Sequence, residues 1–259
     1  MVDRHGLRAY LISDGARSTA RQLETDLASG FEVVLMRPVF VEEVALTSPE
    51  VVDEAGFRAR HLRPPLRGEV GCALAHRNVY AEILNSDGPW ALVIEDDVVI
   101  LEVNLFEERV LEFIRTLPTK EPVIVNMNID AADPHRFSRK YSVAGLWQPS
   151  VATFTTSCYL LNAQAAAKLH ARQFPICSQA DWPVTAREVL FLQESMPIAR
   201  PADDQRSLVD PHDERGDFAL GLRLQMWSGI WFVRHRKHFK GLKDYWNCVL
   251  KPRLYRHIY

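Results

Sequence analysis

The sequence predicts an α/β fold with a mostly parallel sheet and flanking helices, and two observations carry that prediction. Apolar stretches typical of strands alternate with amphipathic stretches typical of helices through the first half of the chain. The chain has 259 residues, of which 47% are hydrophobic and 25% charged, so it can bury a full core as one large domain or as a domain plus an appendage. A basic, aromatic segment at the C-terminal end stands apart from this pattern.

A strand, a helix and a second strand open the chain. Residues 7–13 predict a strand, and residues 18–29 predict a helix for which Ser18 is a suitable N-cap. A second strand is predicted over 31–38, where a proline ends it because proline cannot donate to a sheet. The segment 41–67 is irregular and rich in Pro and Arg, so we expect it to be mostly loop.

The same alternation continues from residue 68. Apolar residues at helical spacing predict a helix over 68–88, which the dipeptide Asp-Gly ends. The remaining predicted elements are a strand over 90–95, a helix over 105–117, strands over 122–128 and 153–161, and a helix over 162–173 that Asn162 caps.

Cysteine usage and the N-terminus bear on where the protein works. The cysteines are widely spaced and form no CxxC pair, so neither a zinc ribbon nor a disulfide framework is expected; they are Cys72, Cys158, Cys177 and Cys248. The first residues carry no apolar leader, and no apolar run approaches 18 residues. We therefore expect a cytoplasmic protein with reduced thiols that neither carries a signal peptide nor spans a membrane.

The sequence ALVIEDDVVI, residues 91–100, carries the strongest chemical signal. In an open parallel sheet, ligands bind at the carboxyl ends of strands, which is where Glu95, Asp96 and Asp97 lie. In extended backbone Glu95 and Asp97 project to one side and Asp96 to the other. Two carboxylates on one side suit Mg²⁺ or Mn²⁺, although a solvated acidic turn would have the same composition.

The preceding helix supplies the context for these acids. Glu69 and His76 are seven residues apart and share a helix face, and Gly68 and Gly71 allow a ligand or backbone to approach the first turn. A helix N-terminus also attracts phosphate. The alternative is a capped helix with a hydrogen-bonded histidine.

Together these two stretches resemble glycosyltransferase family 25, whose members include the lipooligosaccharide galactosyltransferases of Gram-negative bacteria. The usual pattern is Gly-Glu-x-Gly-Cys-x-x-Ser-His, an amphipathic helix, and a strand that ends in Glu-Asp-Asp. The segments GEVGCALAH and WALVIEDDV match it, with Ala75 in place of the usual serine. Looser similarity extends over residues 7–217, and the opening loop keeps Arg17 and Arg21 but departs from the family pattern.

The resemblance implies a GT-A type, Rossmann-like fold and inverting transfer of galactose from UDP-galactose with Mn²⁺ or Mg²⁺. It implies that Asp97 is the leading metal ligand, that Glu95 assists it, and that Asp96 contacts the ribose of the donor or a metal-bound water. It also makes Glu69 a catalytic candidate and indicates donor-binding roles for Gly68, Gly71 and His76.

Further candidates are assigned by residue chemistry within that resemblance. An inverting transfer needs a general base, for which Asp181 beside Trp182 is the preferred residue; the alternative is a carboxylate that starts a helix. His212 is a candidate for a third metal ligand or for a contact to the diphosphate, and the alternative is a solvated loop histidine. Arg17 and Arg21 can clamp phosphate, or else serve as unliganded arginines of a first helical turn.

The C-terminal segment is basic and aromatic. From residue 231 to residue 259 there are eight Lys or Arg and one acidic residue, whereas the rest of the chain has a net charge of −9. This composition favours peripheral contact with an anionic membrane through 227–256, on the cytoplasmic face of the inner membrane. An ordinary C-terminal helix with a buried aromatic face is the alternative, and nucleic-acid binding is not expected.

We therefore predict a glycosyltransferase domain over 1–220 and an appended segment over 221–259. The predicted reaction is metal-dependent transfer of galactose from a UDP-sugar to a lipid-linked oligosaccharide, a lipooligosaccharide core sugar. The alternatives are the same fold with another nucleotide sugar and an inactive relative that binds a nucleotide sugar.

Overall fold

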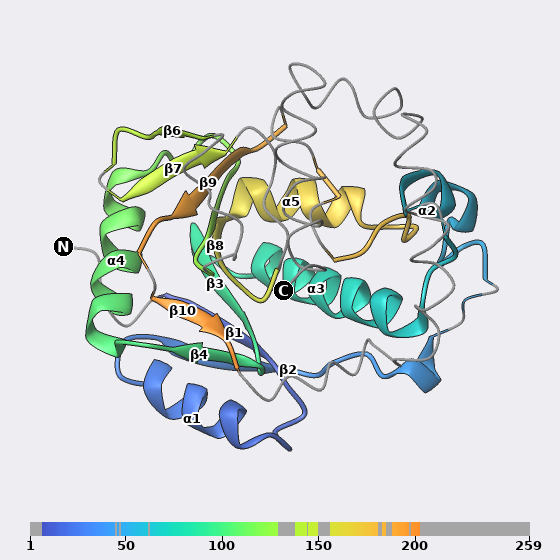
Figure 1. The fold of residues 1–259 in the computed structure, drawn as a ribbon, viewed down its shortest axis with the longest axis horizontal. Helices are drawn as coiled ribbons and strands as arrows, with labels where there is room; N and C mark the ends of the chain where they lie inside the picture. Colours follow the sequence, from blue (N-terminus) through green and yellow to red (C-terminus); the bar gives the residue numbers. More distant parts are fainter. Residues whose placement is uncertain are drawn as a thin grey trace, which may run out of the picture.

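The centre of the molecule is a twisted sheet between two layers of helices (Figure 1). A computed structural model describes residues 7–44, 46, 48–61, 63–128, 138–143, 145–149, 156–180, 183–184, 188–196 and 198–202. Within these residues the sheet has eight strands in the order β2-β1-β3-β8-β5-β9-β7-β6. They are β1 (Arg8–Ile12), β2 (Glu32–Met36), β3 (Trp90–Glu95), β5 (Val123–Asn126), β6 (Ser138–Lys140), β7 (Leu146–Pro149), β8 (Cys158–Asn162) and β9 (Leu190–Glu194).

Strand direction divides the sheet into two parts. Strand β1 pairs in parallel with β2 on one side and with β3 on the other, and β5 pairs in parallel with β9. Strand β8 lies between β3 and β5 and is antiparallel to both, and β7 is antiparallel to β9 and β6. The fold is therefore α/β with a mixed sheet, in which six of the eight described strands run in one direction.

Four helices cover the two faces. Helices α3 (Arg67–Asn85) and α5 (Ala163–Arg172) lie on one face, and α1 (Ser18–Leu27) and α4 (Val103–Thr116) lie on the other (Figure 1). The remaining elements are α2 (Glu54–His61), the short 3₁₀ helix η2 (Val41–Glu43), and a small antiparallel pair, β4 (Val98–Ile100) with β10 (Ala199–Pro201). Among the described residues, no helix is both long and apolar enough to cross a bilayer.

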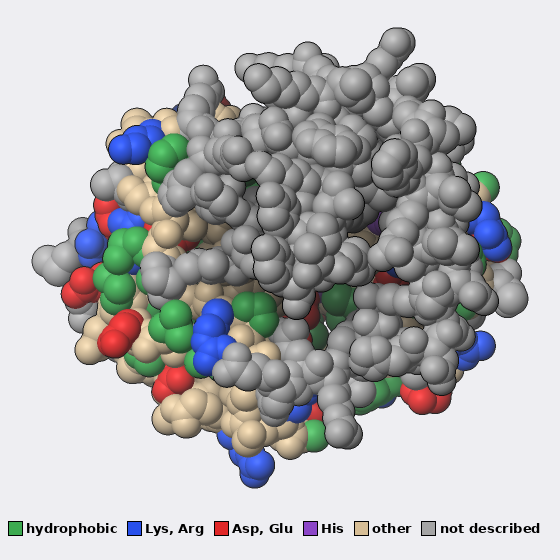
Figure 2. Space-filling view, viewed as in Figure 1, with side chains coloured by type: hydrophobic (Ala, Val, Ile, Leu, Met, Phe, Trp, Pro, Cys, Tyr) green, Lys and Arg blue, Asp and Glu red, His purple; other side chains and the backbone are tan. Residues whose placement is uncertain are grey.

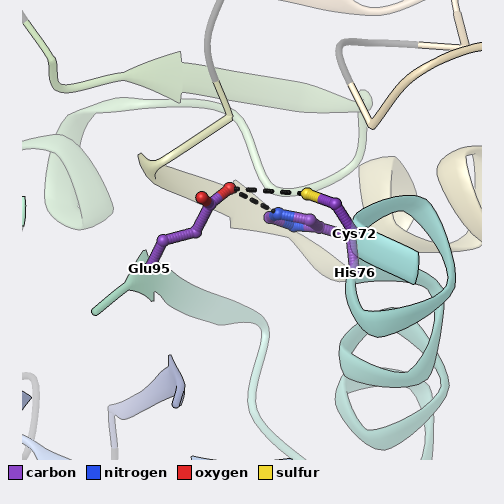
Figure 3. Close-up of side chains that lie close together, drawn as sticks. All are labelled: Cys72, His76 and Glu95. Carbon is purple, nitrogen blue, oxygen red and sulfur yellow. Dashed lines mark hydrogen bonds and ion pairs between the residues drawn. The ribbon is translucent and has the colours of Figure 1, made fainter. Parts of the chain in front are cut away.

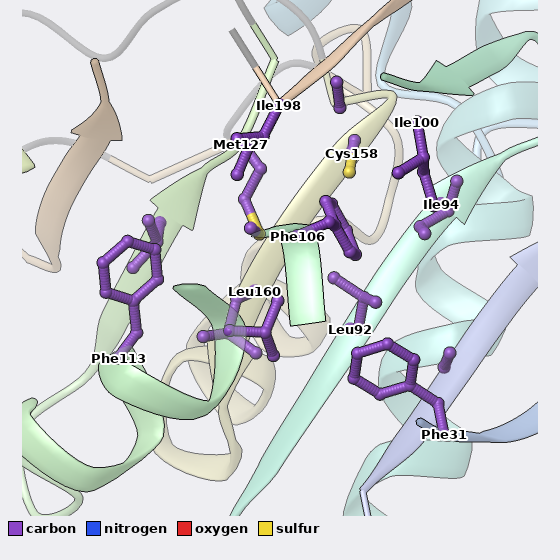
Figure 4. Packing of buried hydrophobic residues seen from close by; sticks show 14 of the residues in the cluster. Phe31, Leu92, Ile94, Ile100, Phe106, Phe113, Met127, Cys158, Leu160 and Ile198 are labelled. Atoms are coloured by element: carbon purple, nitrogen blue, oxygen red, sulfur yellow. The ribbon is translucent and has the colours of Figure 1, made fainter. Parts of the chain in front are cut away.

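The core follows the two-residue period of the strands. In β3, Leu92 and Ile94 pack with Phe106 and Phe113 of α4 in one apolar cluster (Figure 4). Ala91 and Val93 point to the opposite face, into a second cluster with α3 and α5. Because both faces are covered, β3 is apolar from Trp90 to Ile94, and its two core positions on each face are buried. The same alternation of side chains between the two faces determines which face Glu95, the last residue of β3, points to.

Several predicted elements are confirmed, with ends displaced by a few residues. The strand over 90–95 matches its predicted bounds, and Asn162 caps α5 by accepting the backbone N–H of Ala165 at 3.0 Å. The first helix has Arg17 as its N-cap, so Ser18 is the first helical residue instead of the cap. Segment 41–67 was expected to be mostly loop, yet it contains η2 and the eight-residue helix α2.

The described part of one face carries a mixed set of charges. In Figure 2, Lys and Arg side chains alternate with Asp and Glu side chains over the described surface, and hydrophobic side chains are scattered among them. The basic C-terminal segment 221–259 and the proposed boundary at 220 lie outside the described residues.

Candidate active site

The three acids lie at the point where the chain switches direction across the sheet. From β1 the chain crosses through α1 to β2 on one side, and it later returns to place β3 on the other side of β1. The last residue of β1, Ile12, pairs with Glu95, the last residue of β3. In open α/β sheets the crevice outside such neighbouring carboxyl ends is where ligands bind.

Glu95 faces α3, as the parity of β3 requires. Its Oε1 atom lies 2.9 Å from Nε2 of His76 and 3.9 Å from Sγ of Cys72 (Figure 3). Within the described residues both of these contacts fall on the same carboxylate oxygen, which leaves Oε2 available to a ligand. The side chain is 25% exposed.

A buried relay holds His76 in place. The imidazole is 0% exposed, and its Nδ1 atom lies 2.8 Å from the hydroxyl of Tyr159 on β8. Tyr159 in turn donates to the hydroxyl of Tyr80 over 3.1 Å. Burial, followed by the neighbouring Tyr80 hydroxyl, raises the pKa of Tyr159 well above its usual value, so this hydroxyl stays protonated. Both ring nitrogens of His76 are therefore occupied inside the protein, and the ring supports Glu95.

Asp96 points to the opposite face, toward the loop that follows β1. Its Oδ2 accepts from Ser13 Oγ at 3.0 Å, its Oδ1 lies 3.5 Å from Arg17 Nε, and its backbone oxygen accepts from Thr19 Oγ1 at 2.6 Å. Burial raises the pKa of Asp96, while the Ser13 hydrogen bond and the Arg17 charge oppose that rise. Asp96 thus ties the start of α1 to the end of β3.

Asp97 is the acid whose charge is least compensated. The chain turns at Asp96 and Asp97 into β4, so the extended geometry expected through residue 97 ends at Glu95. Oδ1 of Asp97 is buried and has no hydrogen-bond partner among the described residues. Burial and the negative charge of Glu95 raise the pKa of Asp97 to about 6, against the opposing charge of Arg17. The positive charge of a bound cation would oppose both effects and lower the pKa of Asp97.

Arg17 forms an ion pair with Asp96 of this acidic turn. Its side chain is 29% exposed, so it lies between Asp96 and solvent. Arg21 is exposed on α1, one turn further along the helix. Arg17 and Arg21 were both candidates to bind phosphate, and the structure places Arg17 next to the acids.

Glu69 and the glycines of α3 have local structural partners. Glu69 is 3% exposed and accepts from Arg63, Gln179 and the backbone N–H of Leu66. Burial raises its pKa, but these hydrogen bonds outweigh that effect and the pKa is lowered overall. A Cβ atom at Gly71 would lie 2.5 Å from the carbonyl oxygen of Val39, so glycine is needed for close packing there.

The structure therefore brings some sequence candidates together and leaves others apart. Cys72, His76 and Glu95 form one group, and Asp96 and Arg17 form another, with Asp97 between them in the turn. Glu69 takes part in a separate ion pair, and Gly68 lies in the first turn of α3. Asp181 and His212 lie outside the described residues.

Sequence reasoning missed the partners supplied by the loop after β1, by α1 and by β8. Ser13 and Thr19 bond to Asp96 across more than 75 residues of sequence, and Tyr159 reaches His76 across 83. Strand parity in β3 and β8 was the available signal, because it assigns each residue to one face of the sheet.

One comparison with known proteins identifies this arrangement. Residues 54–181, which include α3, the acidic turn and β8, match the family model of glycosyltransferase family 25 (LPS biosynthesis protein). This segment belongs to glycosyltransferase family 25. The resemblance of the two sequence motifs is thereby confirmed, and family 25 membership implies a glycosyltransferase of lipopolysaccharide biosynthesis. No curated protein matches the chain.

Proposed function

We propose that the chain is a metal-dependent, inverting glycosyltransferase of the GT-A type that transfers galactose from UDP-galactose to a lipooligosaccharide core sugar. The family match supports the reaction class. The order β2-β1-β3-β8-β5, with one antiparallel strand beside the switch point, supports a nucleotide site beside β1 and β3. The donor sugar, the metal and the stereochemical course rest on the family resemblance.

The observation that carries the proposal is the buried Oδ1 atom of the Asp97 carboxylate. This atom lacks a hydrogen-bond partner in the described structure, and Oε2 of the neighbouring Glu95 is also available. Hard oxygen ligands of this kind suit Mn²⁺ and Mg²⁺, which commonly bind one or two carboxylates together with substrate phosphates. Glu95 and Asp97 therefore fit a divalent cation.

The remaining residues have roles in binding and orientation. When bound, the metal supplies Lewis-acid stabilisation of the negative charge that develops on the departing UDP. Arg17, held by Asp96, can donate to the same diphosphate, and the Ser13 and Thr19 bonds to Asp96 fix the loop that carries it. Asp181 remains our candidate for the base that accepts the proton of the acceptor hydroxyl.

The direct test is UDP release from UDP-galactose by the purified full chain, with Mn²⁺ and after EDTA. Lipooligosaccharide with an incomplete core is the acceptor. We expect Mn²⁺-dependent release, and we expect Asp97→Asn to reduce it at least about 100-fold, because loss of a cation at developing charge costs several kcal/mol. Asp87→Asn, which changes an exposed carboxylate before β3, is the matched control.

Three results would contradict the proposal. Turnover that is unchanged by EDTA would contradict the metal dependence. Wild-type turnover in Asp97→Asn would contradict the assignment of Asp97 as a metal ligand. Release from another UDP-sugar, with none from UDP-galactose, would retain the reaction and change the donor.

Arg17→Gln separates diphosphate binding from metal binding. A hydrogen bond to a charged group contributes about 1.5–3 kcal/mol, so we expect the KM for the donor to rise about ten-fold to 100-fold. An unchanged KM would show that Arg17 serves only to neutralise Asp96. Arg8→Gln, at an exposed ion pair with Glu32, is the control.

We also propose that the segment 221–259 attaches the enzyme peripherally to anionic membranes, where a lipid-linked acceptor resides. Sedimentation with vesicles that contain anionic lipid tests this, with neutral vesicles as the control. Sedimentation with neither would disprove the attachment.

A further inference from the structure

Three different electron-pair donors converge beside the acidic turn. They are Cys72 Sγ and His76 Nε2 from α3, and Glu95 Oε1 from the end of β3 (Figure 3). We propose that they form a second metal site that binds Zn²⁺, distinct in its ligands from the Mn²⁺ or Mg²⁺ site. The two sites share only Glu95, through different oxygens.

The geometry is close to that of a zinc site. Cys72 and His76 are four residues apart on one helix, so their side chains lie one above the other on the same face. The three donor atoms all lie within 4.8 Å of one another, with Nε2 to Oε1 at 2.9 Å and Sγ to Oε1 at 3.9 Å. A tetrahedral zinc ion with bonds of about 2.0–2.3 Å spaces its ligands by about 3.3–3.6 Å. Shifts of about half an ångström would therefore bring Oε1 of Glu95 to the spacing of a zinc ligand from both Nε2 and Sγ.

The hydrogen bonds behind His76 favour the tautomer that metal binding needs. Tyr159 donates a hydrogen bond to Tyr80, so its oxygen can accept one from His76 Nδ1–H. The 2.9 Å contact of Nε2 with Oε1 of Glu95 needs a proton between the two atoms, and zinc replaces that proton when it binds the Nε2 lone pair. A ligand histidine that donates its other N–H to a fixed acceptor is the usual second layer of a protein zinc site.

The ligand set selects the metal. A thiolate and an imidazole bind Zn²⁺ in preference to Mn²⁺ or Mg²⁺, which prefer oxygen. Coordination replaces the thiol proton of Cys72, which is released to solvent. Cys72 is half-buried and Glu95 is 25% exposed, so an ion can reach the cluster although His76 is buried.

Because Glu95 belongs to both sites, zinc should act on the proposed reaction. Zinc draws Glu95 toward α3 and adds positive charge beside the Mn²⁺ or Mg²⁺ position. This consequence rests on the proposed function: Zn²⁺ should inhibit Mn²⁺-dependent transfer. The binding of zinc itself does not depend on that function.

The test is a titration of the metal-free full chain with Co²⁺, which replaces Zn²⁺ and reports its ligands by absorption. We expect one equivalent to give intense tetrahedral bands and a thiolate-to-cobalt charge-transfer band, both removed by Zn²⁺. Cys72→Ser should abolish the charge-transfer band, whereas Cys177→Ser, at another half-buried cysteine, should retain it. Tyr159→Phe should weaken Co²⁺ binding about 10-fold to 100-fold through the lost acceptor.

Alkylation of cysteines in the wild-type chain is a second test of zinc binding, and it needs no variant. Zn²⁺ should protect Cys72, but not Cys177, against iodoacetamide, as read by mass spectrometry. Absence of the charge-transfer band, its survival in Cys72→Ser, or equal labelling of Cys72 with and without Zn²⁺ would overturn the site.

The two proposals can fail separately. Asp97→Asn should keep the cobalt spectrum while losing Mn²⁺-dependent UDP release. A normal cobalt spectrum without UDP release in the wild type would refute the transferase and support the zinc site.

Discussion

Asp97→Asn should make the metal-free protein more stable near neutral pH. The pKa of Asp97 is raised from 3.8 to about 6 by burial and by Glu95, so its ionised form is disfavoured in the folded state. At 1.36 kcal/mol for each pKa unit, this shift corresponds to about 2–3 kcal/mol of stability lost once the group ionises. Asparagine keeps the shape of the side chain and removes the charge.

The sign follows from proton binding. Between about pH 4 and pH 6 the folded state holds a proton on Asp97 that the unfolded state has released. The contribution of this group is therefore fully present below about pH 4 and is lost as the pH rises through 6. The wild type and Asp97→Asn should be equally stable near pH 4, and the variant should be more stable by about 2–3 kcal/mol above pH 7.

Urea unfolding across this pH range, in the presence of EDTA, measures the difference. Adding Mn²⁺ at pH 7 should stabilise the wild type and leave the variant nearly unchanged, because a ligand stabilises the state that binds it. Asp87→Asn should shift stability by no more than about 0.5 kcal/mol. A difference between wild type and Asp97→Asn that stays constant from pH 4 to pH 7 would refute the reasoning.

Three further changes test the packing that positions the site. Gly71→Ala should cost about 1–3 kcal/mol in urea unfolding, because the new Cβ would lie 2.5 Å from the Val39 carbonyl oxygen. Arg109→Met should cost about 3–5 kcal/mol, because it leaves the fully buried carboxylate of Glu194 without its cation. Asn162→Ala should cost at least about 1 kcal/mol in thermal unfolding, since its Oδ1 caps α5 and also accepts from the backbone of β5.

Each of these has a control in the same chain. Gly88→Ala meets nothing closer than 3.4 Å and should be nearly neutral, and equal losses at both glycines would contradict the packing argument. Arg172→Met breaks an exposed pair with Glu188 and should cost no more than about 1 kcal/mol. Asn162→Asp keeps the capping oxygen but loses the amide that donates to the carbonyl oxygens of Pro118 and Glu121. Recovery of stability in this variant would assign the loss to the cap, and no recovery would assign it to the amide donor.

The sequence predicted the strands and helices whose patterns are strong. Strand β3 is apolar from Trp90 to Ile94 because both of its faces are covered, and α5 begins at an asparagine cap. Helix α2 was missed because Phe57 is its one fully buried apolar side chain, so it shows little periodicity. Strand β9 was missed because its pattern is short and ends in the buried acid Glu194.

The antiparallel direction of β8 could have been predicted from the sequence. No helix was predicted between β5 and β8, and parallel neighbours usually need a helical crossover. The antiparallel pairing of β8 with β5 and β3 is consistent with that omission.

The site was predictable only in its local part. The acids and the α3 motif lie within 30 residues of sequence, and the parity of β3 separates Glu95 from Asp96. Tyr159, Ser13 and Arg17 come from distant segments, and their contacts depend on strand order, which periodicity alone does not determine. The turn at Asp97 reflects the pairing of β4 with β10, another contact between distant segments.

The position of β1 sets a limit on how the enzyme can be shortened. The family match begins at residue 54, yet β1 pairs along the whole of β3 up to Glu95. A fragment of residues 54–181 would leave β3 as an unpaired edge with bare backbone N–H and C=O groups, which invites aggregation. It would also leave Asp96 without Ser13 and Arg17. The smallest soluble, donor-binding unit must therefore start before Arg8, well upstream of the segment by which the family is recognised.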